Sequence, residues 1–270
     1  MLLKNVLRAT AAATLFASLP GHAITDGELD GNAHPNVGLM VALDASGNPM
    51  WRCSGTMVSQ RHFLTAGHCT YGAARVTIWF DADIDAGRPG NGYPFVGQAF
   101  GTPYTHPDYP TASFVRNDVG VVILEPGFVG PGPYATLPPV GELDRLARKR
   151  GLQDLTFTAV GYGLQASFPD AASWKNVAYR VRMVATPMLL QINVPGFTGD
   201  FSILLSNNAA TGGTCFGDSG GPNFIGDSNV IGGVTSYGIN GNCAGTGGVF
   251  RMDTKNVQDW LATVPGFPLP

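Results

Sequence analysis

Glycine and proline break this chain into short segments, and this limits the folds that it can adopt. The 270 residues include 37 glycines and 20 prolines. The segments between them are rich in Val, Ile, Thr and aromatic residues, which favour β-strands, whereas Gly and Pro favour turns. Long stretches with the helical spacing of apolar residues are scarce. The sequence therefore predicts an all-β protein, built as a barrel or as a sandwich.

The expected strands lie in both halves of the chain, and a short helix is expected near its end. Asp253 is the predicted N-cap of this helix, and Val257, Trp260 and Leu261 fall on one helical face. The predicted strands cover residues 37–43, 75–80, 119–124, 155–160, 177–184 and 230–234.

The first 23 residues have the composition of a secretory signal peptide. Lys4 and Arg8 accompany a mostly small or apolar stretch over residues 9–19, and a small-residue pattern typical of signal peptidase sites ends at Ala23. The apolar stretch is too short to span a bilayer stably. The sequence predicts cleavage after Ala23 and secretion, extracellular or periplasmic, without a membrane anchor. The style of the signal suggests a bacterial secretor.

The rest of the chain is mildly acidic, because the signal holds two of the 16 basic residues and none of the 19 acidic ones. This charge argues against a nucleic-acid partner. The one basic cluster is interpreted as a solvated loop or helix face; it consists of Arg145, Arg148, Lys149 and Arg150.

Four cysteines, Cys53, Cys69, Cys215 and Cys243, belong to the exported part of the chain. They can pair in three ways, and the sequence alone does not choose among them. A zinc site is the competing interpretation, but the cysteines lack the paired short spacings of zinc ligands.

Three residues have the chemistry of a hydrolase. They are His68 in LTAGHC, Asp118 in NDVGVVIL and Ser219 in GGTCFGDSGGP. A serine hydroxyl is a poor nucleophile at neutral pH, so it needs an imidazole to take its proton and a buried carboxylate to orient that imidazole. Each residue alone has an ordinary alternative, which is a core histidine, a turn-forming aspartate or an exposed serine in a glycine-rich turn. The three motifs together favour catalysis.

These motifs resemble those of the trypsin/chymotrypsin-like serine proteases, from Ile24 nearly to the C-terminus. The segments ITDGELDGNAHPNVGLMVAL, VTSYG and GGVFRM also follow that family's order. The resemblance implies two six-stranded antiparallel Greek-key β-barrels with the active site in the cleft between them. The first barrel would cover about residues 24–140, the second about 141–252, and the C-terminal helix about 253–263. An esterase or lipase of the α/β-hydrolase type is excluded, because its order is Ser, acid, His.

The resemblance also implies roles around the nucleophile. The amides of Gly217 and Ser219 would form the oxyanion hole, and Ser236 would donate a hydrogen bond to Asp118. After cleavage, the new amine of Ile24 would form an ion pair with Asp218. The implied disulfides are Cys53–Cys69, beside His68, and Cys215–Cys243, beside Ser219.

The resemblance places the base of the substrate pocket at Gly213. Enzymes of the family that cleave after Arg or Lys carry an aspartate there, and a buried cation without a partner is unfavourable. We therefore expect an open, largely apolar pocket that takes large apolar or aromatic residues. Thr214 would line it, and Gly238 and Gly248 would form its walls. Thr235 stands where an acid-specific protease would carry a histidine.

The expected partners are protein or peptide substrates, together with proteinaceous inhibitors. Backbone atoms of Ser236, Tyr237 and Gly238 would pair with an extended peptide as an added strand. The chain is expected to act as a monomer and without a cofactor. A catalytically silent binding protein on the same scaffold is the alternative function.

Asp81, Asp83 and Asp85 alternate as the ligands of a calcium loop do. Gly92 takes the place of the bidentate glutamate of an EF-hand, so that site is excluded. A solvated turn is favoured over a stabilising calcium site, and no metal site is assigned.

Overall fold

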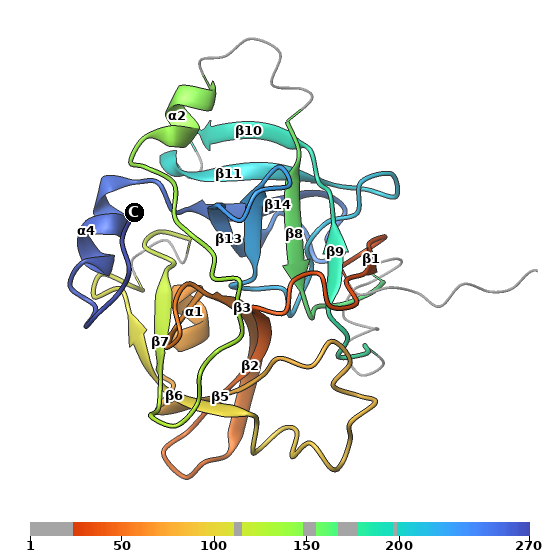
Figure 1. Cartoon of the computed structure of the whole chain (residues 1–270). Coiled ribbons are helices and arrows are strands. Elements are labelled where there is room, and N and C mark those ends of the chain that lie inside the picture. Colours follow the sequence, from red (N-terminus) through yellow and green to blue (C-terminus); the bar gives the residue numbers. More distant parts are fainter. Residues whose placement is uncertain (1–23, 111–114, 148–154, 167–177, 197–198) are drawn as a thin grey trace, which may run out of the picture.

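Two β-sheets form the body of the molecule (Figure 1). The computed structural model describes residues 24–110, 115–147, 155–166, 178–196 and 199–270. The predicted signal over residues 1–23 and most of the basic cluster, Arg148, Lys149 and Arg150, lie outside the described residues. The expected all-β, two-barrel architecture with a short C-terminal helix is confirmed.

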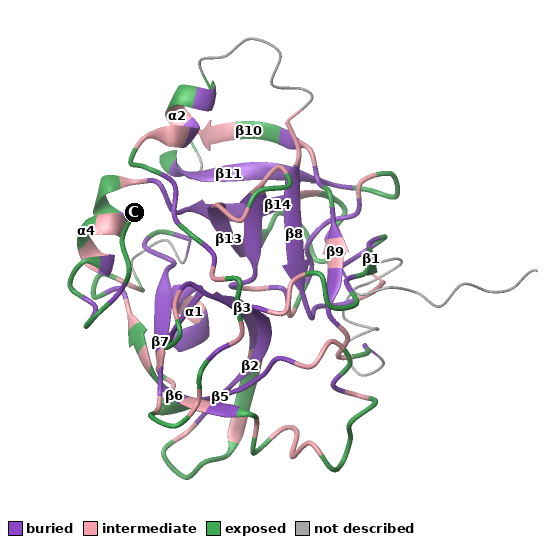
Figure 2. Ribbon diagram, viewed as in Figure 1, coloured by how far each residue is buried: buried purple, intermediate pink, exposed green. Residues whose placement is uncertain are grey.

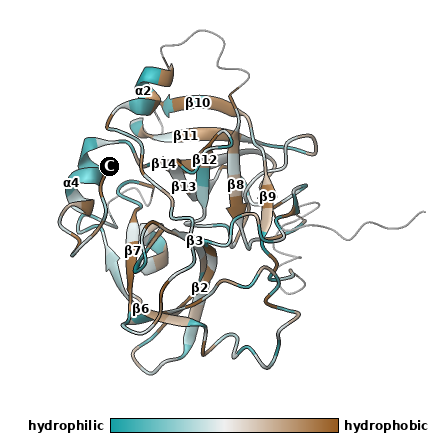
Figure 3. Cartoon of the chain, viewed as in Figure 1, coloured by the Kyte–Doolittle hydropathy of each residue, from teal (hydrophilic) through white to brown (hydrophobic). Residues whose placement is uncertain are grey.

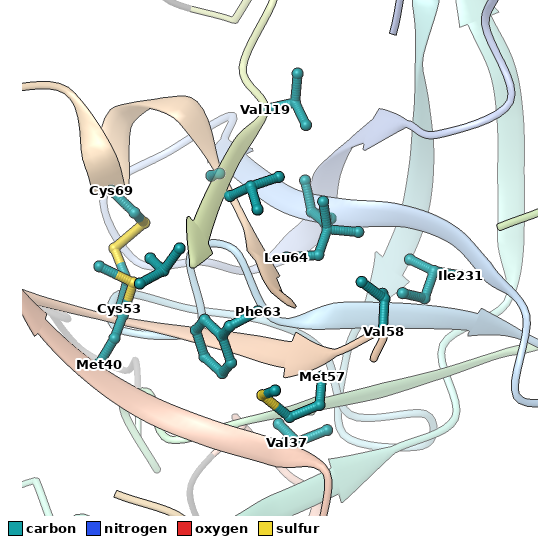
Figure 4. Close-up of a cluster of buried hydrophobic side chains, with 14 of the residues drawn as sticks. Val37, Met40, Cys53, Met57, Val58, Phe63, Leu64, Cys69, Val119 and Ile231 are labelled. Carbon is teal, nitrogen blue, oxygen red and sulfur yellow. A yellow bond between two sulfur atoms is a disulfide. The ribbon is translucent and has the colours of Figure 1, made fainter. Parts of the chain in front are cut away.

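The first sheet is a closed antiparallel barrel in the order β2-β3-β4-β7-β6-β5. Every residue of β2 is buried, since this strand pairs with β3 and β5 and is covered on both faces, which explains its uninterrupted apolar sequence. Apolar side chains such as Val37, Met40, Phe63 and Leu64 pack on both faces of these strands, in one buried cluster (Figure 4). The strands are β2 (Val37–Leu43), β3 (Pro49–Met57), β4 (His62–Thr65), β5 (Arg75–Trp79), β6 (Ala99–Thr105) and β7 (Gly120–Leu124).

The second sheet has eight strands in the order β1-β9-β8-β12-β13-β14-β11-β10. Residues 186–188 alone separate β9 from β10, although these strands lie at or near opposite ends of the sheet. Counted as one bent strand, β9 and β10 close a six-stranded barrel, to which β1 adds an outer edge. The strands are β1 (Glu28–Leu29), β8 (Phe157–Gly161), β9 (Met183–Ala185), β10 (Leu189–Val194), β11 (Gly199–Asn207), β12 (Pro222–Ile225), β13 (Ile231–Gly238) and β14 (Gly245–Arg251).

One predicted strand, residues 177–184, is mostly wrong. Within the described residues only its end, from Met183, joins the sheet as β9. The residues before it pair instead with the loop that follows β5: the amide of Arg182 donates to the carbonyl of Ala82, and the amide of Ile84 to that of Arg180. This loop and β9 belong to different halves of the chain, so local sequence could not predict the pairing.

Three helices lie in the described part of the chain: α1 (Gly67–Thr70), α2 (Glu142–Ala147) and α4 (Lys255–Leu261). The predicted N-cap of the last helix is wrong. Thr254 occupies the cap position without a side-chain bond, and the carboxylate of Asp253 instead accepts hydrogen bonds from the amide of Leu143 and from Arg251. Because the carboxylate of Asp253 bonds to the start of α2 and to the buried guanidinium of Arg251, it does not cap α4.

Buried residues concentrate in the strands of both sheets, and the exposed ones lie mainly in the connecting loops (Figure 2). The hydropathy of the chain follows the same division, with apolar residues along strands such as β7 and β8 (Figure 3). None of the described helices is long and apolar enough to cross a membrane.

A fully buried arginine joins the N-terminal segment to both sheets. The guanidinium of Arg182 lies 2.8 Å from Oδ2 of Asp30, which is also fully buried at its side chain. It donates to the carbonyls of Val37 and Phe80 in the first half and to the hydroxyl of Tyr162 in the second. Removing one partner of such a buried pair typically costs about 3–5 kcal/mol, because the other charge is left without compensation.

Candidate active site

His68 and Asp118 meet at the edge of the first barrel. His68 lies in α1, which follows β4, and Asp118 lies just before β7, the partner of β4. Nδ1 of His68 is 2.9 Å from Oδ2 and 3.1 Å from Oδ1 of Asp118. The backbone amide of His68 also donates to Oδ1, at 2.8 Å. The carboxylate thus holds both the ring and the backbone of the histidine.

Asp118 is fully buried and receives a third donor from the second sheet. The hydroxyl of Ser236, in β13, donates to its Oδ2. Asn117, immediately before it, has a φ of 55°, a left-handed conformation that asparagine tolerates better than most residues. The turn aims the carboxylate inward, and the side chain of Asp118 is fully shielded from water.

The pKa of His68 is raised above its ordinary value. Burial acts in the opposite direction, because it disfavours the charged imidazolium, but the charge and the hydrogen bond of Asp118 outweigh it. The side chain of His68 remains 28% exposed, so a substrate can reach the ring. An imidazole whose charged form is stabilised in this way is suited to accept a proton during a reaction.

Ser219 lies in the loop between β11 and β12, and this loop needs glycine. Gly217 and Gly220 have φ values of 100° and 77°, which residues with a side chain rarely adopt. A Cβ on Gly220 would lie 2.0 Å from Oγ1 of Thr65. The carbonyl of Ser219 accepts from the amide of Ser54 in β3, at 2.8 Å, which fastens the loop to the first barrel.

The amides of Gly217 and Ser219 donate to no described residue. Two unpartnered amides in one glycine-rich loop can accept an anionic oxygen as their ligand. The predicted oxyanion donors are therefore available for such a ligand.

His68 and Ser219 line one cavity of about 420 Å³. No hydrogen bond joins their side chains in the part of the chain that the structure describes. In enzymes without substrate such contacts are often long and tighten when substrate binds. The structure thus brings His68 and Ser219, predicted as base and nucleophile, to the same cavity from opposite sheets.

The same cavity is also lined by residues of the second sheet and of the Cys215–Cys243 disulfide. The predicted pocket residues Thr214, Ser236, Tyr237 and Gly238 are among them. Gly213 and Gly248 are not, and the space beside each is filled. A Cβ on Gly248 would lie 2.3 Å from the ring of Tyr237, and one on Gly213 would lie 2.3 Å from Cγ of Asn207.

Asn207, at the end of β11, is a site residue that sequence reasoning missed. Its amide donates to the carbonyl of Thr214, at 2.9 Å, and its Oδ1 accepts from the hydroxyl of Thr25, at 2.7 Å. Thr25 also pairs with Gly213 in an antiparallel bridge. No motif around Asn207 indicates this position, because the contact depends on how β11 meets the loop before Ser219.

The ion pair predicted between Ile24 and Asp218 belongs to a cleaved chain, whereas here the nitrogen of Ile24 forms the peptide bond with Ala23. Ile24 is fully buried beside Ala159 and Met183. The carboxylate of Asp218 accepts from the amides of Gly163, at 2.7 Å, and Cys215, at 2.9 Å. Burial raises the pKa of Asp218 to about 7, although these amides and the charge of Arg52 act to lower it.

Both disulfides implied by the resemblance are present. Cys53–Cys69 joins β3 to α1, next to His68, and Cys215–Cys243 joins the loop before Ser219 to the turn between β13 and β14. One bond thus anchors the segment that carries His68, and the other anchors the segment that carries Ser219.

The three aspartates of the possible calcium loop take separate partners. Asp81 accepts from the side chain of Gln98, Asp83 from the amide of Ala86, and Asp85 from Arg88 and Arg180. Among the described residues these carboxylates do not form a cluster of metal-ligand spacing.

The closed barrel, the second sheet, and the His68–Asp118 pair that shares a cavity with Ser219 fit the class of serine endopeptidases. Residues 30–261 match the model of the family described as Trypsin. The chain belongs to the trypsin family.

Known relatives agree with this assignment. The chymotrypsin of Phaedon cochleariae is 27% identical over 228 residues, which are 81% of this chain and 74% of that protein. The brachyurin of Leptuca pugilator is 27% identical over 221 residues, 80% of this chain and 89% of that protein. A solved structure titled HL collagenase shares the fold, with a TM-score of 0.68, 19% identity and coverage of 91% of this chain and 100% of that one. The relatives come from insects and a crab, so they give no support to a bacterial origin.

Proposed function

We propose that this chain is a secreted endopeptidase in which Ser219, His68 and Asp118 act as nucleophile, general base and orienting acid. The observation that carries the proposal is the fully buried Asp118 carboxylate, which holds His68 at the cavity that Ser219 lines. His68 takes the hydroxyl proton as the oxygen of Ser219 attacks the peptide carbonyl. It then gives that proton to the leaving amine, and an acyl-enzyme remains. Water, activated by the same imidazole, hydrolyses the ester and restores Ser219.

The oxygen that becomes negative during each attack needs donors at that moment. The amides of Gly217 and Ser219 are suited to this role, since they have no competing partner among the described residues. Removing one such donor typically lowers kcat about 10²–10³-fold.

Labelling and digestion test the proposal together. A sulfonyl fluoride is expected to modify Ser219 and to abolish the digestion of casein, with the modified residue located by mass spectrometry. Casein digestion that continues after complete labelling of Ser219 contradicts the assignment. If neither labelling nor digestion occurs in the mature protein, the alternative of a silent binding protein is correct.

The substrate pocket is proposed to take large apolar or aromatic residues. Its described lining includes Thr214, Thr235, Tyr237 and the half-cystines Cys215 and Cys243, and no acidic residue. A lysine or arginine of the substrate would find no counter-charge there.

The filled space beside Gly213 gives a testable specificity prediction. Gly213→Asp alone is expected to impair folding and activity, because its Cβ would collide with Asn207. In the double variant with Asn207→Gly, the aspartate at position 213 has room, and its carboxylate can pair with a basic side chain of the substrate. We expect the double variant to cleave after Arg and Lys, measured with a peptide panel in which the residue before the cut varies. Asn207→Gly alone is the control, and an active Gly213→Asp single variant would show that Asn207 does not restrict this position.

The activation of the enzyme is proposed to depend on the cut after Ala23. That cut would free the amine of Ile24. The charged amine would then form an ion pair with the buried carboxylate of Asp218. The docking of Thr25 against Gly213 supports this proposal, since the segment that follows the cut already lies on the loop that carries Asp218.

Residues left in front of Ile24 are therefore expected to lower kcat/KM by about 10²–10⁴-fold, which corresponds to the roughly 3–5 kcal/mol typical of a broken buried ion pair. Protein that begins at Ile24 is compared with protein that begins Met-Ile24, at equal concentration on one peptide substrate. An extension after Pro270 is the control and should leave the rate unchanged. Equal activity of the two N-terminal forms contradicts the mechanism, as does secreted protein whose N-terminal sequence starts at another residue.

A further inference from the structure

A second cavity, of about 570 Å³, meets the first at the reacting side chains. Both cavities are lined by His68, Phe216 and Ser219. The second is otherwise formed mainly by the start of β3, with Met50, Trp51 and Arg52.

The position of this cavity assigns it to the leaving-group side of a substrate. If the acyl part of a peptide occupies the first cavity and its carbonyl lies at Ser219, the chain continues past His68 in the other direction. The second cavity lies there, on the side of the Cys53–Cys69 disulfide. This step depends on the proposed function.

The walls of the second cavity are unusually apolar for a surface. Met50, Trp51 and Phe216 are 38%, 36% and 43% exposed, and exposed apolar side chains that gather at one place typically mark a binding surface. The indole of Trp51 is fixed, because its Nε1 donates to the carbonyl of Cys69 at 3.0 Å. The rigid ring offers contact area at a small cost in side-chain entropy.

Arg52 gives this surface its charge. No described residue forms a hydrogen bond or an ion pair with its guanidinium, and no acidic residue is among those that line the cavity. Its Nε would lie 3.5 Å from a Cβ on Gly217, so the cation lies beside the oxyanion loop. The buried Asp218 behind that loop senses its charge but does not contact it.

We propose that Arg52 is a specificity-determining residue that selects an acidic side chain in the leaving-group part of the substrate. An arginine that pairs with none of the described residues, in a cavity with apolar walls, is arranged to form a charge-assisted pair with a carboxylate. The apolar walls exclude part of the water that would screen the pair. The enzyme then favours peptides with Asp or Glu shortly after the scissile bond.

The test uses matched peptides and the enzyme that begins at Ile24. All peptides have Phe before the scissile bond and alanines after it, and one of the first three alanines is replaced by Glu, Gln or Lys. Rates are normalised to the active sites titrated with a sulfonyl fluoride. At one of the three positions we expect kcat/KM to be about fivefold higher for Glu than for Gln, the upper range for a partly exposed ion pair, and this ratio should fall as salt is added.

Variants of Arg52 separate a substrate contact from an effect on the oxyanion loop. Arg52→Gln is expected to bring the ratio of Glu to Gln near one, Arg52→Lys to restore most of it, and Arg52→Glu to favour Lys instead. Arg75→Gln, which removes a charge paired with Glu125 on the exposed face of the same barrel, is the matched control and should keep the wild-type ratio. Equal rates for Glu, Gln and Lys at all three positions overturn the inference, as does a preference that persists in Arg52→Gln. If no peptide is cleaved by any form, the proposed function fails as well.

Discussion

Ser219→Ala is expected to lower kcat by about a millionfold, the loss typical when the nucleophile of a triad is removed. The alanine fits the loop without strain, because the loop's geometry depends on Gly217 and Gly220 and on the carbonyl at position 219, which all remain. The measurement is peptide hydrolysis with the enzyme that begins at Ile24, together with a thermal unfolding curve. We expect an unchanged Tm and nearly complete loss of turnover.

Ser228→Ala is the control for this substitution. Ser228 is an exposed serine in the turn between β12 and β13 whose hydroxyl donates to the carbonyl of Ile225. Its replacement should leave kcat unaltered. Turnover by Ser219→Ala at more than about a thousandth of the wild-type rate would mean that another group attacks the substrate.

Asp118→Asn is the second substitution with a large expected effect. The amide group of asparagine would donate where the carboxylate now accepts from His68, so the ring would be held in the wrong tautomer, and kcat should fall about 10⁴-fold. The acid side of the pH profile should move as well. Activity needs neutral His68 and is lost as pH falls through its raised pKa; without the carboxylate only burial remains, which lowers that pKa. The acid limb of kcat/KM is therefore expected at a lower pH in the variant.

Ser236→Ala separates the effect of the Asp118 charge on kcat from the effect of one hydrogen bond to that carboxylate. It removes one hydrogen bond to the carboxylate but leaves the contacts with the ring and the backbone amide of His68. The net worth of such a bond is about 1 kcal/mol, so kcat should fall no more than about tenfold. An acid limb that stays in place in Asp118→Asn would show that another group controls the titration.

Much of the fold could be predicted because it follows from local patterns. Strand β2 was expected at residues 37–43 and is found there, since its run of apolar residues suits a strand buried on both faces. The predicted strand over residues 177–184 failed because Arg180 and Arg182 pair with a loop from the other half of the chain. The failure at the cap of α4 has a similar origin, since Asp253 bonds to Arg251 and to α2.

In the site, too, the residues that lie in local motifs could be predicted, and those placed by tertiary packing could not. His68, Asp118 and Ser219 lie in motifs whose neighbours explain their positions: a half-cystine after His68, a buried strand after Asp118 and glycines around Ser219. Asn207 and Arg52 have no such motif. Arg52 lines the second cavity, and Asn207 lies behind the lining of the first, where it bonds to Thr214; both places result from the packing of β3 and β11 against the loop that carries Ser219. Residues that act through tertiary contact alone are the ones that sequence reasoning misses.

Arg182 ties the two halves of the chain together, so fragments that separate them lose its partners. Its guanidinium bonds at once to Asp30, to the carbonyls of Val37 and Phe80 and to Tyr162. A cut between the two barrels would leave the guanidinium of Arg182 in the C-terminal fragment without Asp30 and the carbonyls of Val37 and Phe80. We therefore expect neither barrel to fold on its own, and chimaeras that exchange one barrel with a relative should carry the N-terminal segment with Asp30 along with Arg182.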